Sequence, residues 1–215
     1  MSSEPELLRS AEAPITLALV AGRWKNHLGV AAVPLYLAGS VAISGVGRWI
    51  MLGQAVFMVI GHRNIGYAAP REARLRTFRT LRIDGAQRAC RALGLAEPAV
   101  FDMDLDVDSA VVALRCWRSH RPAVTAVCAY NDDYAFALLA GMRNLGLEAP
   151  RDLAVIGVDN GPMAPFACPA LTTVDMHTDV MAAHLAHVIL DGLAGRTPPD
   201  RPRVEVFTVV VRDSA

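Results

Sequence analysis

Polar side chains that suit ligand binding follow three apolar segments of this 215-residue chain. The segment VTAVCAY is followed directly by Asn131 and Asp132, and the segment DLAVIGV is followed by Asp159. A third segment, PAVF, runs into the acidic string DMDLDVD. Carboxylates and amides satisfy the hydroxyls of a polyol or the N–H groups of a nucleobase. If the fold brings these segment ends together, they predict a binding site for such a molecule.

Helix capping is the competing explanation for two of these residues. Asn131 and Asp132 stand immediately before the apolar helical pattern at 133–145, and both residue types are favoured N-caps. Gly146 supplies the left-handed residue that ends this helix. Capping and ligand contact are compatible, so both explanations stay open. Asp159 precedes no strong helical pattern, which favours a role as a ligand acceptor.

An arginine-rich segment, 71–91, carries seven arginines against two acidic residues. A solvated helix face accounts for most of them. One arginine that reached the ligand would supply a fork of N–H donors that complements the carboxylates.

Apolar segments of strand length alternate with helical patterns along the chain. The predicted strands are 15–21, 40–44, 64–69, 98–103, 123–129, 152–158 and 205–211. The predicted helices are 49–61, 75–94, 108–120, 133–145 and 178–194. This alternation predicts an α/β fold with a parallel sheet covered on both faces. Ligands of such sheets bind beyond the carboxyl ends of the strands, where the polar segment ends would lie.

Composition and charge argue against several other classes of protein. The 21 basic and 21 acidic residues give no net charge, which disfavours a freestanding nucleic-acid binder. Four cysteines form no C-x-x-C pair, and the acidic N-terminus does not have the pattern of a secretory signal, so a reducing cytoplasm is expected. Residues 28–47 are uncharged over the length of a bilayer span, but Pro34 and Gly39 interrupt them. Buried parallel strands also read as continuous apolar runs, so we predict no membrane span.

Catalytic and cofactor motifs do not emerge from the sequence. It contains no G-x-S-x-G, P-loop or H-E-x-x-H pattern, and Gly45-x-Gly47 lacks the third glycine of a dinucleotide fingerprint. His184 and His187 are three residues apart, but no third ligand lies nearby in sequence, so no metal site is predicted. We therefore predict a binding protein without enzyme activity or cofactor.

The order of several motifs resembles a known family. GHRNIGYAAP, RIDGAQRA, the segment 124–160, PALTTVDM and VVVRDS together resemble the effector-binding domain of the LacI/GalR (lac/galactose repressor) transcription regulators over about residues 48–215. The resemblance implies an α/β fold of the type I periplasmic-binding-protein kind, with parallel Rossmann-like lobes around a cleft. It also implies ligand contacts from Arg82 of the R-x-x-G motif, from Asn131 and from Asp159, whereas Asp132 would cap its helix.

The resemblance divides the chain into three parts. Residues 1–47 would be a remnant of the N-terminal lobe, 48–175 the C-terminal effector-binding lobe, and 176–215 the crossover helix and final strand that return between the lobes. The family's helix-turn-helix has no counterpart in this sequence, and one lobe is expected to be incomplete. The sequence would then be a fragment, a mis-started reading frame or a degenerate paralogue. The resemblance also implies that an aromatic or polar residue on the loop around 105–108 completes the pocket.

The leading hypothesis is the effector-sensing and dimerisation portion of a LacI/GalR regulator. Its expected partners are a small-molecule effector, such as a sugar, and a second copy of the chain. Operator DNA would be bound only through a DNA-binding domain outside this sequence. The alternatives are the solute-binding protein of a sugar transporter, a small α/β enzyme and a membrane-attached protein.

Overall fold

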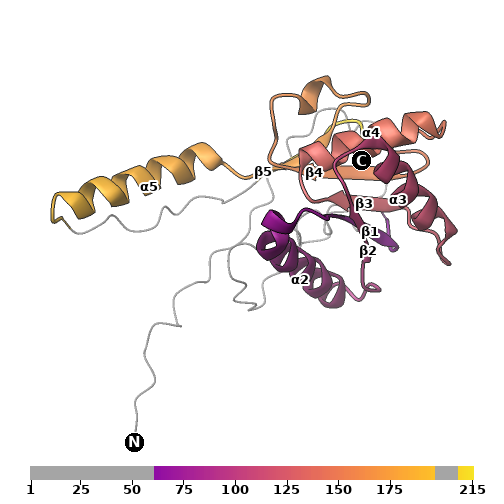
Figure 1. The fold of residues 1–215 in the computed structure, drawn as a ribbon, viewed down its shortest axis with the longest axis horizontal. Helices are drawn as coiled ribbons and strands as arrows, with labels where there is room; N and C mark the ends of the chain where they lie inside the picture. Colours follow the sequence, from indigo (N-terminus) through magenta and orange to yellow (C-terminus); the bar gives the residue numbers. More distant parts are fainter. Residues whose placement is uncertain (1–60, 197–207) are drawn as a thin grey trace, which may run out of the picture.

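The described residues of the computed structural model, 61–196 and 208–215, contain one six-stranded sheet with helices on both faces (Figure 1). The strands are β1 (Ile65–Pro70), β2 (Ala99–Met103), β3 (Ala126–Ala129), β4 (Ala154–Val158), β5 (Thr172–Asp175) and β6 (Thr208–Val210). The helices are η1 (Ala73–Leu75), α2 (Arg76–Ala92), α3 (Val107–Ser119), α4 (Asp132–Asn144), η2 (Ala164–Phe166) and α5 (Thr178–Leu193).

The sheet has the strand order β2-β1-β3-β4-β5-β6. The first five strands are parallel, and β6 pairs antiparallel with β5. In this doubly wound order the chain direction across the sheet reverses between β1 and β3, and such a switch point opens a crevice at the carboxyl edge. The predicted α/β fold with a parallel sheet is therefore confirmed.

Two apolar clusters hold the helices to opposite faces of the sheet. On one face α3 and α4 bury Leu114, Trp117 and Leu138, and the indole N–H of Trp117 donates to the Ala99 carbonyl over 2.8 Å. On the other face α2 packs on β1, where Tyr67 is among the buried residues. Because β1 and β3 are parallel neighbours, the loops that follow them lie at the same edge of the sheet.

Most predicted elements inside the described residues are confirmed within about three residues of their expected bounds. Gly146, with φ of 66°, is the left-handed residue that follows α4, as predicted. The predicted elements 15–21, 40–44 and 49–61 lie outside the described residues, and so does the start of the predicted strand 205–211.

Strand β5 was not predicted, because its sequence, TTVD, is short and polar. Its threonines are buried all the same, since their polar groups bond to protein. The Thr172 hydroxyl accepts from the Arg212 backbone N–H over 2.9 Å, and the Thr173 hydroxyl donates to Asp132. Hydrogen bonds to distant residues therefore hold 172–175 as a strand, where the sequence predicted no regular element.

Helix α5 stands away from the sheet (Figure 1). It leaves from β5, and the chain returns beside β5 as β6, so α5 is inserted between two neighbouring strands. The division into parts 1–47, 48–175 and 176–215 stays a prediction. No helix in the described part of the chain has both the length and the apolar character of a bilayer span.

Candidate functional site

Arg82 lies at the switch point between β1 and β3. It projects from α2, and its guanidinium donates to the carbonyl oxygen of Tyr130, the residue that follows β3. The guanidinium carbon also lies 4.2 Å from the centroid of the Tyr130 ring, a cation–π contact. Two contacts with one residue fix Arg82 at the carboxyl edge of the sheet, where the crevice of a doubly wound fold lies.

Asn131 is the N-cap of α4. Its side-chain oxygen accepts from the Tyr134 backbone N–H over 3.2 Å. The prediction that Asp132 caps this helix is wrong, because Asn131 has the extended backbone of a cap and Asp132 is already helical. The capping bond uses only the amide oxygen of Asn131, so its NH₂ group retains donor capacity at the same edge.

Asp132 is buried and joins the ends of three strands. Its carboxylate accepts from the Gly161 backbone N–H over 2.7 Å and from the Thr173 hydroxyl. Burial raises the pKa of Asp132, while these two hydrogen bonds oppose the rise. A Cβ at Gly157 would come within 2.1 Å of an Asp132 oxygen, so this close contact requires glycine.

Sequence reasoning missed this role of Asp132. Its two hydrogen-bond donors lie 29 and 41 residues further along the chain, and no local pattern connects them.

Asp159 follows β4 in an unusual backbone conformation. Its φ is 113°, and the next residue, Asn160, has φ of 50°. Positive φ is uncommon for residues with a side chain, and such strain concentrates at functional sites. The Asp159 backbone N–H donates to the Val174 carbonyl over 2.8 Å, which anchors this turn to β5.

The electrostatic surroundings of Asp159 couple it to the other site residues. Although its surface is exposed, the protein around it raises the pKa of Asp159 to about 6, with loss of hydration as the largest cause. The Arg82 cation lowers this pKa, whereas the charges of Asp132 and Asp133 raise it. The charges of Asp159 and Arg82 therefore act on each other.

Asn160 anchors the turn after β4 by two side-chain hydrogen bonds. Its amide donates to Asp175 over 2.9 Å and accepts from the Arg212 guanidinium over 2.8 Å. These bonds occupy Asn160 within the protein and leave Asp159 as the exposed acceptor of the pair.

Three carboxylates at the end of β2 and in the loop that follows it form hydrogen bonds within the protein. Asp102 accepts from Arg79, Asp104 accepts from Arg71, and Asp106 caps α3 by accepting from the Ser109 N–H over 2.7 Å. Leu105, in the same loop, is 55% exposed. Leu105 is neither aromatic nor polar, so it does not meet the expectation for this loop, which stays a prediction.

The arrangement suits binding of a hydroxylated molecule. Arg82 offers N–H donors, Asp159 offers acceptor oxygens, and Asn131 offers an amide NH₂ group. Within the described residues, no cluster of three or more His, Cys, Asp or Glu side chains could hold a metal ion.

Residues 56–215 match the sequence profile of the periplasmic binding protein-like domain. The chain belongs to this family. Among solved structures, the complex of the transcriptional regulator CelR with cellobiose matches this periplasmic-binding-protein-like chain with a TM-score of 0.64 and 30% identity, over 80% of this chain and 52% of CelR. A LacI-family regulator from Burkholderia phymatum matches with a TM-score of 0.65 and 26% identity, over 79% of this chain and 61% of that one.

Curated relatives of this periplasmic-binding-protein-like chain are transcriptional regulators. CelR of Thermobifida fusca is 32% identical over 157 residues, 72% of this chain and 45% of CelR. GalS of Salmonella typhimurium is 32% identical over 137 residues, 63% of this chain and 40% of GalS. The chain spans less than half the length of these relatives. The resemblance to the effector-binding domain of LacI/GalR regulators is confirmed.

Proposed function

We propose that this chain is the effector-sensing part of a LacI/GalR-type transcription regulator and that it binds a sugar or a similarly hydroxylated molecule. The observation that carries the proposal is that Arg82, fixed on Tyr130 after β3, and Asp159, which follows β4, lie at the same carboxyl edge of the sheet. A guanidinium fixed over Tyr130 and a carboxylate held at positive φ face the same edge of the sheet. Ligands of doubly wound sheets bind at this position.

A sugar is the favoured class of effector. CelR, a 30% identical structure, is a complex with cellobiose, and sugars combine hydroxyl groups with apolar C–H faces. The carboxyl edge offers both kinds of contact, because Phe78 at the start of α2 is 54% exposed and Leu105 is 55% exposed. These two apolar side chains would lie against a sugar ring while Arg82 and Asp159 bind its hydroxyls.

Ligand binding in such a regulator shifts an equilibrium between two conformations. We assign operator binding to a helix-turn-helix outside this sequence, because this chain has no net charge with which to attract DNA. We also assign the chain to the cytoplasm, where a regulator reaches its operator. The relatives are transcriptional regulators, which favours this function over a transporter's solute-binding protein and over an enzyme.

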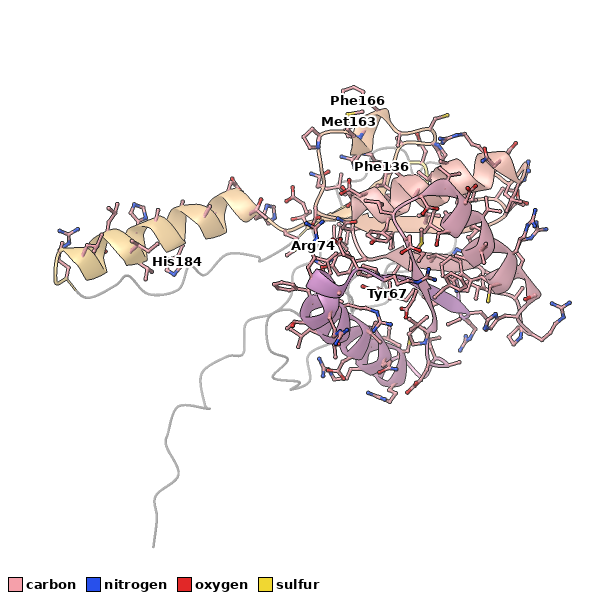
Figure 2. The ribbon with its side chains drawn as sticks, viewed as in Figure 1. Tyr67, Arg74, Phe136, Met163, Phe166 and His184 are labelled. Atoms are coloured by element: carbon pink, nitrogen blue, oxygen red, sulfur yellow. The ribbon has the colours of Figure 1, made fainter. Side chains whose placement is uncertain are left out.

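We further propose that the chain forms a homodimer through an apolar patch of Phe136, Met163 and Phe166. Met163 and Phe166 are 61% and 78% exposed, and they lie together at η2, since the Phe166 N–H donates to the Met163 carbonyl over 3.0 Å. Figure 2 shows them above Phe136 of α4. Large exposed apolar side chains grouped in this way are typical of protein–protein interfaces.

Thermal melting of the chain with a panel of compounds tests the ligand proposal. The panel contains cellobiose, other disaccharides, monosaccharides, sugar acids and purine bases. A compound at 100 times its Kd adds about 2.7 kcal/mol to the native state, which raises the melting temperature by several degrees.

Two aspartate variants locate the site in this experiment. Asp159→Ala removes the proposed acceptor, and Asp213→Ala removes an exposed carboxylate near the start of β5, at the opposite edge of the sheet. We expect the shift to persist in Asp213→Ala and to disappear in Asp159→Ala. A shift that survives Asp159→Ala would refute the site, and a cooperative melt that no compound shifts would refute sugar sensing by this chain.

A further inference from the structure

Two buried side-chain atoms in the described part of the chain have no hydrogen-bond partner, the Tyr67 hydroxyl and Arg82 Nε. Tyr67 is 1% exposed, so water in bulk does not reach its hydroxyl. Buried polar groups are almost always paired, and an unpaired one destabilises the fold. These two atoms therefore indicate that a polar group of a bound molecule completes their hydrogen bonding.

The two atoms belong to the same site. Tyr67 lies on β1, directly opposite Cys128 of β3, and so beside the switch point. Its side chain is buried on the face that α2 covers, and Figure 2 shows Tyr67 where α2 meets the sheet. Arg82 reaches the same pair of strands, because its guanidinium donates to the carbonyl of Tyr130, the residue that follows β3. Burial raises the pKa of the Tyr67 hydroxyl, and the charge of Arg82 acts in the opposite direction.

The hydrogen-bonding capacities of the two groups define the missing partner. Arg82 Nε carries one N–H and can only donate, whereas the Tyr67 hydroxyl can donate and accept. The terminal nitrogen of Arg82 is already fixed on the Tyr130 carbonyl, so the guanidinium cannot simply turn toward Tyr67. One oxygen placed between them would accept from Arg82 and exchange a hydrogen bond with Tyr67.

We propose that Tyr67 is a further ligand-positioning residue, whose hydroxyl and Arg82 Nε form the floor of the site and hold one hydroxyl or carbonyl oxygen of the bound molecule. This inference rests on the proposed function, because it needs a ligand bound beside Arg82 at the carboxyl edge of the sheet. It also requires that the ligand carries an oxygen atom that reaches the Tyr67 hydroxyl on β1, which contacts with Asp159 and Asn131 do not require.

Tyr67→Phe tests the proposal, because it keeps the ring and removes only the hydroxyl. The first measurement needs no ligand: the urea midpoint of unfolding of the free protein should stay the same or rise, since an unpaired buried hydroxyl is lost. A lowered midpoint would show that the hydroxyl has a partner within the protein, and it would overturn the proposal whether or not any sugar binds.

The second measurement is calorimetric titration with cellobiose of the parent, Tyr67→Phe and Asp213→Ala. Asp213 is the control, because its exposed carboxylate lies near the start of β5, at the opposite edge of the sheet. We expect Tyr67→Phe to weaken cellobiose binding about tenfold and Asp213→Ala to change it less than about twofold. Equal affinity of Tyr67→Phe and parent, or equal losses in both variants, would overturn the proposal.

The two measurements separate this proposal from the proposed function. If the parent does not bind cellobiose or any other compound of the panel, the sugar-sensing function fails. The urea midpoint of Tyr67→Phe still decides whether the hydroxyl is unpaired in the free protein.

Discussion

At the scale of single residues, Asp159 combines two unfavourable features in one position. Its backbone lies at φ of 113°, and its pKa is raised to about 6. Its neighbours hold the turn in this conformation, because Asp132 accepts from the Gly161 N–H and the Asn160 amide donates to Asp175 of β5. A carboxylate held in this way is ready to form strong hydrogen bonds when a ligand arrives.

The raised pKa gives Asp159→Asn a pH-dependent effect on stability. The folded chain binds the Asp159 proton more tightly than the unfolded chain, whose carboxyl has a pKa of about 3.9. The stabilisation by this proton is complete below pH of about 4 and is lost as the pH rises through about 6. At pH 7.5 the ionised carboxylate therefore destabilises the fold, and Asp159→Asn should melt about 1–3 °C higher than the parent. Solvent exposure keeps this gain small.

Melting curves of both proteins from pH 7.5 down to pH 4.5 check this prediction. The difference in melting temperature should shrink as the parent carboxyl takes up its proton. A difference that does not change with pH would mean that asparagine acts only by relieving the backbone at positive φ, which it tolerates better than most residues.

Asp132 is predicted to contribute to stability rather than to ligand binding. Asp132→Ala would leave the Gly161 N–H and the O–H of the buried Thr173 without their acceptor, which should lower the free energy of unfolding by about 3 kcal/mol. Asp133→Ala, at the exposed neighbouring position, should change it by less than about 0.5 kcal/mol. Urea unfolding of the two variants provides the comparison, and equal stabilities would contradict the role assigned to Asp132.

At the scale of elements, the close approach of α3 and α4 depends on Gly141. A Cβ there would lie 3.2 Å from the Ala110 Cβ and from Leu114 Cδ1. Gly141→Ala gains about 1 kcal/mol of helix propensity, but overpacking between two fixed helices costs about 1–3 kcal/mol. We expect a net loss of about 1 kcal/mol in urea unfolding.

Gly192→Ala in α5 is the control for Gly141→Ala, because the added methyl meets nothing within 4 Å. Its urea midpoint should equal or exceed that of the parent. If Gly141→Ala were as stable as Gly192→Ala, the two packed helices would have room to separate, and the packing argument would fail.

The sequence predicted those elements whose signals are local. Hydrophobic periodicity locates α3 and α4, and Gly146 marks the end of α4 because only its own backbone conformation is involved. Strand β5 and the role of Asp132 escaped prediction, because both depend on hydrogen bonds between residues some 40 positions apart.

The candidate site was predictable in part for the same reason. The strand-end rule indicates Asn131 and Asp159 from sequence, and the family resemblance adds Arg82. The rule gives no sign of Tyr67, which lies within β1 and has an ordinary strand sequence around it.

At the scale of the whole molecule, two groups among the exposed apolar side chains of the described residues bear on assembly. One is α5, where Ile189, Leu190 and Leu193 are all more than half exposed and the helix stands clear of the sheet (Figure 1). The other is the patch of Phe136, Met163 and Phe166, which lies on the body of the sheet domain (Figure 2). Since the second group belongs to the packed body, a substitution there tests assembly without disturbing α5.

Phe166→Asp should convert the proposed homodimer into a monomer. An aspartate at the centre of the patch would have to lose its hydration in the interface, and removal of a central aromatic residue alone typically weakens association by 2 kcal/mol or more, about thirtyfold in Kd. Sedimentation equilibrium over a range of concentrations measures this change. Val112→Asp, which replaces a 56% exposed side chain on α3, is the matched control and should leave the mass unchanged. A parent that sediments as a monomer would refute the homodimer, and a Phe166→Asp variant that still dimerises would refute this patch as its interface.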